Sequence, residues 1–145
     1  MEWLEGGLGL AVYLGLKLGG YVVWSYVGVR WLGRTTKPVI VGLLLGVARL
    51  VIGWITGLVV APVALVAVST GHIPVFYFTA LAVVRWFEWG AIQALIPGRP
   101  GPGVGFVTGG SQQGRIWRAV GVCVSYLADA PFLLAEGFPR GRIFC

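Results

Sequence analysis

The sequence predicts an all-α integral membrane protein, a small bundle of about four transmembrane helices forming a single domain over residues 1–145. Of its 145 residues, 57% are hydrophobic and 11% are charged, whereas soluble domains carry about 25% charged residues. A soluble chain of ~150 residues buries only about 70% of the surface that it exposes when unfolded. Much of the apolar surface must therefore face lipid, which also suits the seven Trp and five Tyr.

The first apolar stretch, residues 7–29, is expected to form a transmembrane helix because its 23 residues can cross a hydrocarbon core of about 30 Å. Lys17 lies near its middle, on one helical stripe with tyrosine and tryptophan residues. This stripe is expected to face protein. Gly15 and Gly19 form a G-x-x-x-G pattern, which predicts the close approach of another helix.

The second stretch, residues 39–68, is longer than a membrane crossing requires, since 30 residues reach about 45 Å as a helix. The helix must therefore tilt, kink or protrude, and Pro62 is the expected break. Arg49 shares one face with four glycines, so we expect that face to pack against another helix and Arg49 to meet it. These glycines are Gly42, Gly46, Gly53 and Gly57.

The third stretch, residues 73–96, carries two charges of opposite sign near its middle. Arg85 and Glu88 are three residues apart and can pair on one helix. Trp89 follows Arg85 by four residues and can stack on its guanidinium group. A charge at this depth usually faces protein or water, so we expect the other helices to shelter this pair.

Residues 97–115 are rich in glycine and proline and lack helical periodicity, so a flexible loop is expected there. A phosphate-binding loop is disfavoured because no G-K-[ST] follows the glycines. The fourth helix is expected over residues 116–136, with Asp129 near its middle and a bend at Pro131. This combination leaves open whether the fourth segment crosses the membrane or re-enters it.

Basic residues are distributed unequally between the two expected sides of the membrane. With four crossings, the side of residues 30–37 and 97–115 holds six, against Arg140 and Arg142 on the side of the termini. The positive-inside rule then predicts that both termini lie outside the cytoplasm, in what we expect to be a bacterial inner membrane. The six residues are Arg30, Arg34, Lys37, Arg99, Arg115 and Arg118.

Five charged residues fall deep within the four predicted helices and are expected to meet in one polar centre. They are Lys17, Arg49, Arg85, Glu88 and Asp129. We expect Glu88 to pair with Arg85 or Arg49, and Asp129 with Lys17 or Arg85, which leaves one positive charge in surplus. A purely structural network is the alternative, but polar contacts between membrane helices contribute only ~0.6 kcal/mol on average. Ionisable residues in a membrane therefore favour a functional interpretation.

Three classes of function fit these features. The first is an accessory or assembly subunit of a membrane complex, which suits a short chain with several glycine faces. The alternative is a small oligomeric carrier or channel for a proton or a small anion. A membrane enzyme acting on a lipid is the least favoured, because H-E-x-x-H, G-x-S-x-G and D-x-x-D motifs are absent from the sequence. Whether the chain is an enzyme therefore stays open, and the missing motifs favour a function without catalysis.

No cofactor or metal is expected. With one His and one Met, the chain cannot supply the usual internal pair of haem ligands. Cys123 and Cys145 form neither a C-x-x-C motif nor a zinc spacing. The net charge of +6 lies mainly at segment ends, which suits lipid headgroups better than nucleic acid. The expected partners are the lipid bilayer and other membrane subunits or further copies of the chain.

Overall fold

The computed structural model describes residues 7–69, 71, 73–98 and 105–136 of the chain. These residues form helices and connecting turns, with no strand among them, which confirms the predicted all-α class. The helices are α1 (Gly7–Leu32), α2 (Pro38–Ser69), α3 (Ile73–Ala94), α4 (Gly105–Thr108) and α5 (Gln112–Glu136).

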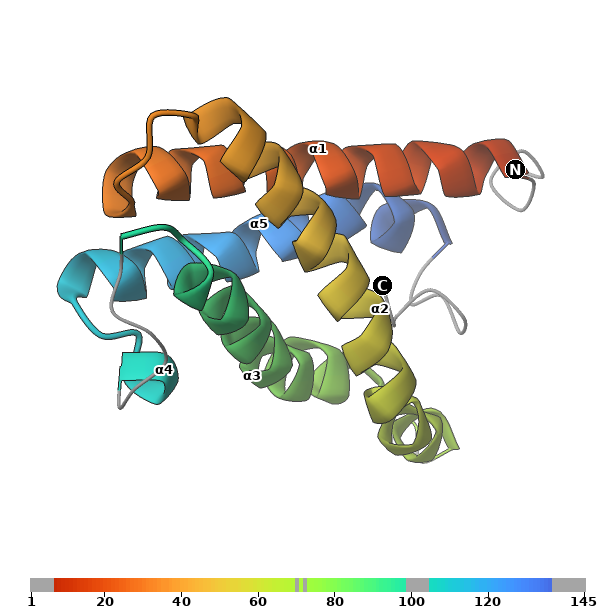
Figure 1. Ribbon diagram of the computed structural model, residues 1–145. Coiled ribbons are helices and arrows are strands. Elements are labelled where there is room, and N and C mark those ends of the chain that lie inside the picture. Colours follow the sequence, from red (N-terminus) through yellow and green to blue (C-terminus); the bar gives the residue numbers. More distant parts are fainter. Residues whose placement is uncertain (1–6, 70, 72, 99–104, 137–145) are drawn as a thin grey trace.

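The four long helices form two antiparallel pairs that cross each other (Figure 1). The first and last helices, α1 and α5, lie side by side, and α2 and α3 cross them as a second pair. Contacts run from α1 to α2, from α2 to α3, from α3 to α5 and from α5 back to α1, while α4 packs on α3. The interior is therefore enclosed by all four long helices.

The link between α1 and α2 lies at the same end of the bundle as the end of α3 (Figure 1). The backbone N–H of Arg34 donates to the carbonyl of Pro97 at 3.0 Å. Beside this bond, a Cβ added to Gly33 would lie 2.8 Å from the side chain of Ile96. The two basic connections therefore sit together, as an up-and-down arrangement of the helices requires.

Two glycines of α2 bring it unusually close to α1. A Cβ added to Gly42 would lie 2.7 Å from the Cα of Tyr26, and one added to Gly46 would lie 2.6 Å from the Cα of Val22. Only glycine allows the two backbones this separation. Gly42 and Gly46 of the predicted glycine face therefore pack on another helix of the chain, whereas Gly53 and Gly57 lie in the wall of a cavity between α2 and α3.

The corresponding expectation for α1 is wrong within this chain. Gly15 and Gly19 are exposed, and nothing lies within 4 Å of a Cβ added at either position. At 100° per residue they lie on the face opposite to Tyr13 and Lys17, which are both buried. The polar and aromatic stripe, not the small residues, determines which side of α1 faces the bundle.

The C-terminal ends of α2 and α5 lie close to the predicted bounds. The α2 helix continues through Pro62 to Ser69, and α5 continues through Pro131 to Glu136, so neither helix is interrupted at its proline. The α5 helix begins at Gln112, four residues earlier than predicted, because the hydroxyl of Ser111 accepts the backbone N–H of Gly114 at 3.2 Å. This is an N-cap interaction, which satisfies a free donor of the first turn.

Two stretches of the described residues are long and apolar enough to cross a membrane, Pro38–Val63 in α2 and Val75–Ala94 in α3. Large apolar side chains along α2 point away from the other helices. They include Leu44, Ile55, Leu58 and Val59, which are 58–78% exposed. Such a surface suits lipid better than water.

The glycine contact yields a paired test of stability. We expect Gly46→Ala to lower the free energy of unfolding by about 1–3 kcal/mol, because the added methyl meets the backbone of α1. Gly15→Ala should raise it by about 0.5–1 kcal/mol, because alanine is the better helix former and has open space there. Unfolding of the purified protein in mixed micelles measures both, and a neutral Gly46→Ala would contradict the helix contact.

Candidate functional site

The five charged residues singled out from the sequence are all buried in the structure. Their exposed fractions lie between 0% and 6%. They come from all four long helices, and three ion pairs connect them: Lys17 with Asp129, Arg85 with Asp129, and Arg49 with Glu88. We call these five residues the polar centre.

Asp129 of α5 joins three helices through a single carboxylate. It lies 2.9 Å from Lys17 Nζ of α1 and accepts a hydrogen bond from Arg85 Nη2 of α3 at 2.6 Å. The hydroxyls of Tyr13 and Tyr77 donate to the same carboxylate at 3.1 and 2.7 Å. Four donors around one buried carboxylate compensate for the loss of its hydration.

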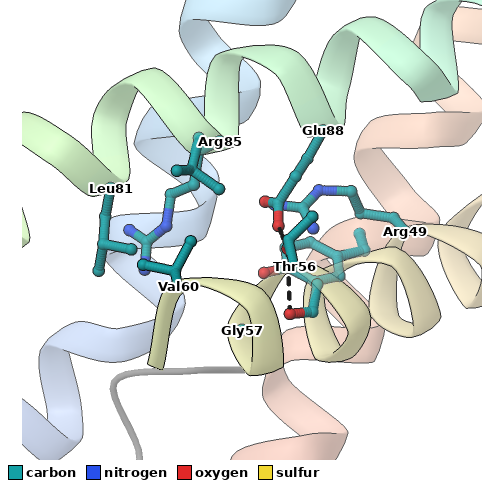
Figure 2. Close-up of a pocket in the computed structure, with 10 residues that line it drawn as sticks. Arg49, Thr56, Gly57, Val60, Leu81, Arg85 and Glu88 are labelled. Atoms are coloured by element: carbon teal, nitrogen blue, oxygen red, sulfur yellow. Dashed lines mark hydrogen bonds and ion pairs between the residues drawn. The ribbon is translucent and has the colours of Figure 1, made fainter. Parts of the chain in front are cut away.

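Glu88 connects α3 to α2 (Figure 2). One carboxylate oxygen accepts a hydrogen bond from Arg49 Nη2 at 2.5 Å, and the other accepts one from the hydroxyl of Thr56. Both partners belong to α2. Glu88 therefore supplies the negative charge that the buried cation of α2 needs, as Asp129 does for the buried cations of α1 and α3.

Aromatic rings lie close to the two guanidinium groups in cation–π contacts. The Arg49 guanidinium lies 4.8 Å from the ring of Tyr21 and 5.2 Å from that of Trp89. The Arg85 guanidinium lies 4.2 Å from the ring of Tyr126 and 5.3 Å from that of Tyr77. Desolvated contacts of this kind contribute about 2 kcal/mol or more, so the rings replace part of the lost hydration.

Some pairings follow the expectations and others do not. Asp129 forms ion pairs with both of its expected partners, Lys17 and Arg85, and Glu88 forms one with Arg49. The ion pairs among the described residues do not include one between Arg85 and Glu88, because the guanidinium of Arg85 turns toward α5. For the same reason Trp89 stacks on Arg49 of α2 and not, as expected, on Arg85 of its own helix.

A small cavity lies between α2 and α3 beside the polar centre, with Arg49, Arg85 and Glu88 in its wall (Figure 2). Its volume of about 20 Å³ is enough for one water-sized occupant. A wider apolar groove of about 350 Å³ runs along the outside of the same two helices. The cavity and the groove share four wall residues: Thr56, Val60, Val84 and Glu88.

A fourth buried cation, Arg118, was expected at the basic rim but is only 2% exposed. It donates to the side-chain oxygen of Gln93 and to the backbone carbonyls of Phe106 at 2.5 Å and Gly105 at 3.3 Å. The indole N–H of Trp86 donates to the carbonyl of Val107 at 3.0 Å. The described part of the predicted flexible loop is therefore packed against α3 and α5.

The role of Tyr77 was not predicted, although its spacing was informative, whereas Tyr13 belongs to the predicted stripe of Lys17. Tyr77, Leu81, Arg85 and Glu88 follow one another at intervals of four, four and three residues, so they share one face of α3. Arg118 likewise falls eleven residues before Asp129, which places both on one face of α5. Neither pattern reveals which partner on another helix each side chain meets.

The chemistry available at this site is binding and charge compensation. Ser125 lies on the same face of α5 as Asp129, but its hydroxyl donates to the carbonyl of Gly121 and accepts the indole N–H of Trp89. It is therefore placed as a structural group, without a base beside it. Among the described residues, no group of three or more His, Cys, Asp or Glu side chains lies together to hold a metal ion.

Comparisons with protein-family models, with curated proteins and with solved structures find no match to this chain. The function is therefore argued from the geometry of the polar centre and from the surface around it.

Asp129 pairs with two cations and Glu88 with one, so removing the two acids should lower the free energy of unfolding by different amounts. Asp129→Asn leaves two buried cations without a counter-charge, whereas Glu88→Gln leaves one. Breaking a buried pair costs about 3–5 kcal/mol, so we expect Glu88→Gln within that range and Asp129→Asn above it. Unfolding in mixed micelles gives both values. Equal costs would contradict the role of Asp129 as the common partner of Lys17 and Arg85.

A double-mutant cycle tests whether Arg49 and Glu88 interact. The double variant Arg49→Met with Glu88→Gln should lose less free energy of unfolding than the two single variants lose in sum. We expect a difference of about 0.5–3 kcal/mol. Simple additivity would show that the two charges do not stabilise each other.

Arg118 holds the loop, which predicts a local effect of its removal. In Arg118→Met, proteinase K should cleave within residues 105–111 about tenfold faster or more, because hydrogen bonds to a charged group each contribute about 1.5–3 kcal/mol. Arg115→Met removes an exposed arginine of the same helix and should leave the cleavage rate unchanged. Equal rates in the two variants would contradict the anchoring of the loop.

Proposed function

We propose that this chain is an integral membrane protein of four transmembrane helices that serves as an accessory or assembly subunit of a membrane complex. The main support for this proposal is that polar groups lie in the interior of the helix bundle while its outer surface is apolar. Ion pairs occupy the interior of the bundle, while large apolar side chains cover the outer faces of α2 and α3. Membrane proteins have this distribution because lipid is their solvent.

The lengths of α1 and α5 support four crossings. With 26 and 25 residues, these helices reach about 38 Å, more than the hydrocarbon core requires. They are less apolar than α2 because their inward faces carry the polar residues, such as Lys17 and Asp129. Their outward faces are apolar, with Val23 and Leu127 exposed by 63% and 69%.

An assembly role is supported by what the exposed surface offers and what the interior lacks. Gly15 and Gly19 present a small-residue face of α1 that no other part of the described chain covers, and such faces allow another helix to approach closely. The interior of the described residues offers ion pairs without a set of catalytic side chains. An assembly subunit in a bilayer needs a face on which another helix can pack, and it does not need catalytic side chains.

Purification from the native membrane tests the assembly role. The tagged protein, solubilised in mild detergent, should elute with a membrane protein in fixed stoichiometry. Gly15→Leu should reduce this association, whereas Ala119→Leu, a change of another exposed small residue on α5, should not. Elution of the chain alone from mild detergent would overturn the assembly role and leave the fold unaffected.

The proposed topology predicts opposite labelling of two cysteines. In a Cys123→Ser background, Ser111→Cys should react from the cytoplasmic side with a thiol reagent that does not cross membranes. Cys145 should react from the other side, because four crossings place both termini outside the cytoplasm. Labelling of both from one side would exclude four crossings and favour a re-entrant α5.

A further inference from the structure

Two arginines in the wall of the cavity between α2 and α3 each have an N–H group without a hydrogen-bond acceptor. These groups are Arg49 Nε and Arg85 Nη1. The two residues are 1% and 5% exposed, so bulk water does not solvate them. Buried donors in native proteins nearly always have a partner, and an unsatisfied donor indicates a bound water or ion.

The rings around the two guanidinium groups restrict where such a partner can lie. Tyr21 and Trp89 pack on the guanidinium of Arg49, and Tyr126 packs on that of Arg85. The rings occupy part of the space around each guanidinium group, and an N–H group donates within the guanidinium plane. The cavity is the open space that both arginines line (Figure 2), and it offers a partner a place beside them.

The charge balance distinguishes an anion from a water molecule. The polar centre holds three cations and two carboxylates, so one positive charge is in surplus. Arg118 lies eleven residues from Asp129 along α5, about 16 Å away, and its own oxygen acceptors hold it there. A water molecule would satisfy the free donors but leave the surplus charge, and an uncompensated charge is costly in a low-dielectric interior.

The size of the cavity restricts the anion further. A volume of about 20 Å³ matches one water-sized species, so the cavity suits a single-atom anion better than sulfate, phosphate or an organic carboxylate. We propose that this cavity is a binding site for one small monovalent anion of the halide class, held by Arg49 and Arg85 between α2 and α3. This inference does not rest on the assembly role proposed above.

Binding of radiolabelled chloride to the purified full-length chain tests the site. With sodium gluconate keeping the ionic strength constant, we expect saturable binding that approaches one chloride per chain. Bromide should compete, whereas sulfate and gluconate should not, because they exceed the cavity. Absence of saturable binding, or equal competition by gluconate, would overturn the proposal and leave water as the occupant.

Two neighbouring valines of α2 provide a matched pair of variants. Val60 lines the cavity, whereas Val59 is 73% exposed on the outside of the same helix. One added methylene in a fitted pocket changes affinity by about tenfold or more, so Val60→Leu should weaken chloride binding by at least this factor. Val59→Leu should bind as the unaltered chain does. Unchanged binding in a folded Val60→Leu would place the anion elsewhere.

Crystals of the unaltered protein soaked in bromide give a measurement that does not depend on any variant. The anomalous scattering of bromide should show one site in the cavity, within hydrogen-bond reach of both guanidinium groups. A bromide site on the surface alone, with the cavity empty of bromide, would overturn the assignment even where Val60→Leu fails to fold.

Discussion

The carboxylate of Asp129 is the interaction on which the arrangement of three helices depends. Lys17 and Arg85 come from α1 and α3, and neither has another acidic partner among the described residues. In a low-dielectric interior an unpaired charge is far more costly than in water. Moving α5 relative to either helix would leave at least one of the two cations uncompensated, so the position of Asp129 restricts the registers of α1, α3 and α5 together.

The attachment of α2 follows a different principle. In the bilayer proposed above, apolar packing would give α2 little preference for its neighbours over lipid, so close backbone contact and polar bonds must provide it. On the side of α1, Gly42 and Gly46 let the two backbones approach. Toward α3, Arg49 and Thr56 bind the two oxygens of Glu88. The glycines of α2 thus allow close packing on α1, while its ion pair and hydrogen bond connect it to α3.

The sequence was informative wherever a feature depended on one helix alone, and less so where it depended on two. The depth of Lys17 and Asp129 along their helices was readable from apolar length, and the pairing then followed because acids were few. The choice of Arg49 over Arg85 as the partner of Glu88 could not be predicted from the sequence, since Arg85 lies one turn before Glu88 on α3 and Arg49 lies near the middle of α2. It depends on the direction in which Arg85 turns, toward Asp129 and the ring of Tyr126.

Arg118 is buried in the structure, although its position in the sequence predicts a place at the membrane surface. It was counted among six basic residues on one side of the membrane, yet its guanidinium is enclosed by loop carbonyls and Gln93. A charge compensated in this way binds lipid headgroups less than an exposed one. Without it, five basic residues still stand against two, and of these Arg30, Arg34, Lys37 and Arg115 are exposed. The proposed orientation therefore depends on the exposed basic residues and does not require Arg118.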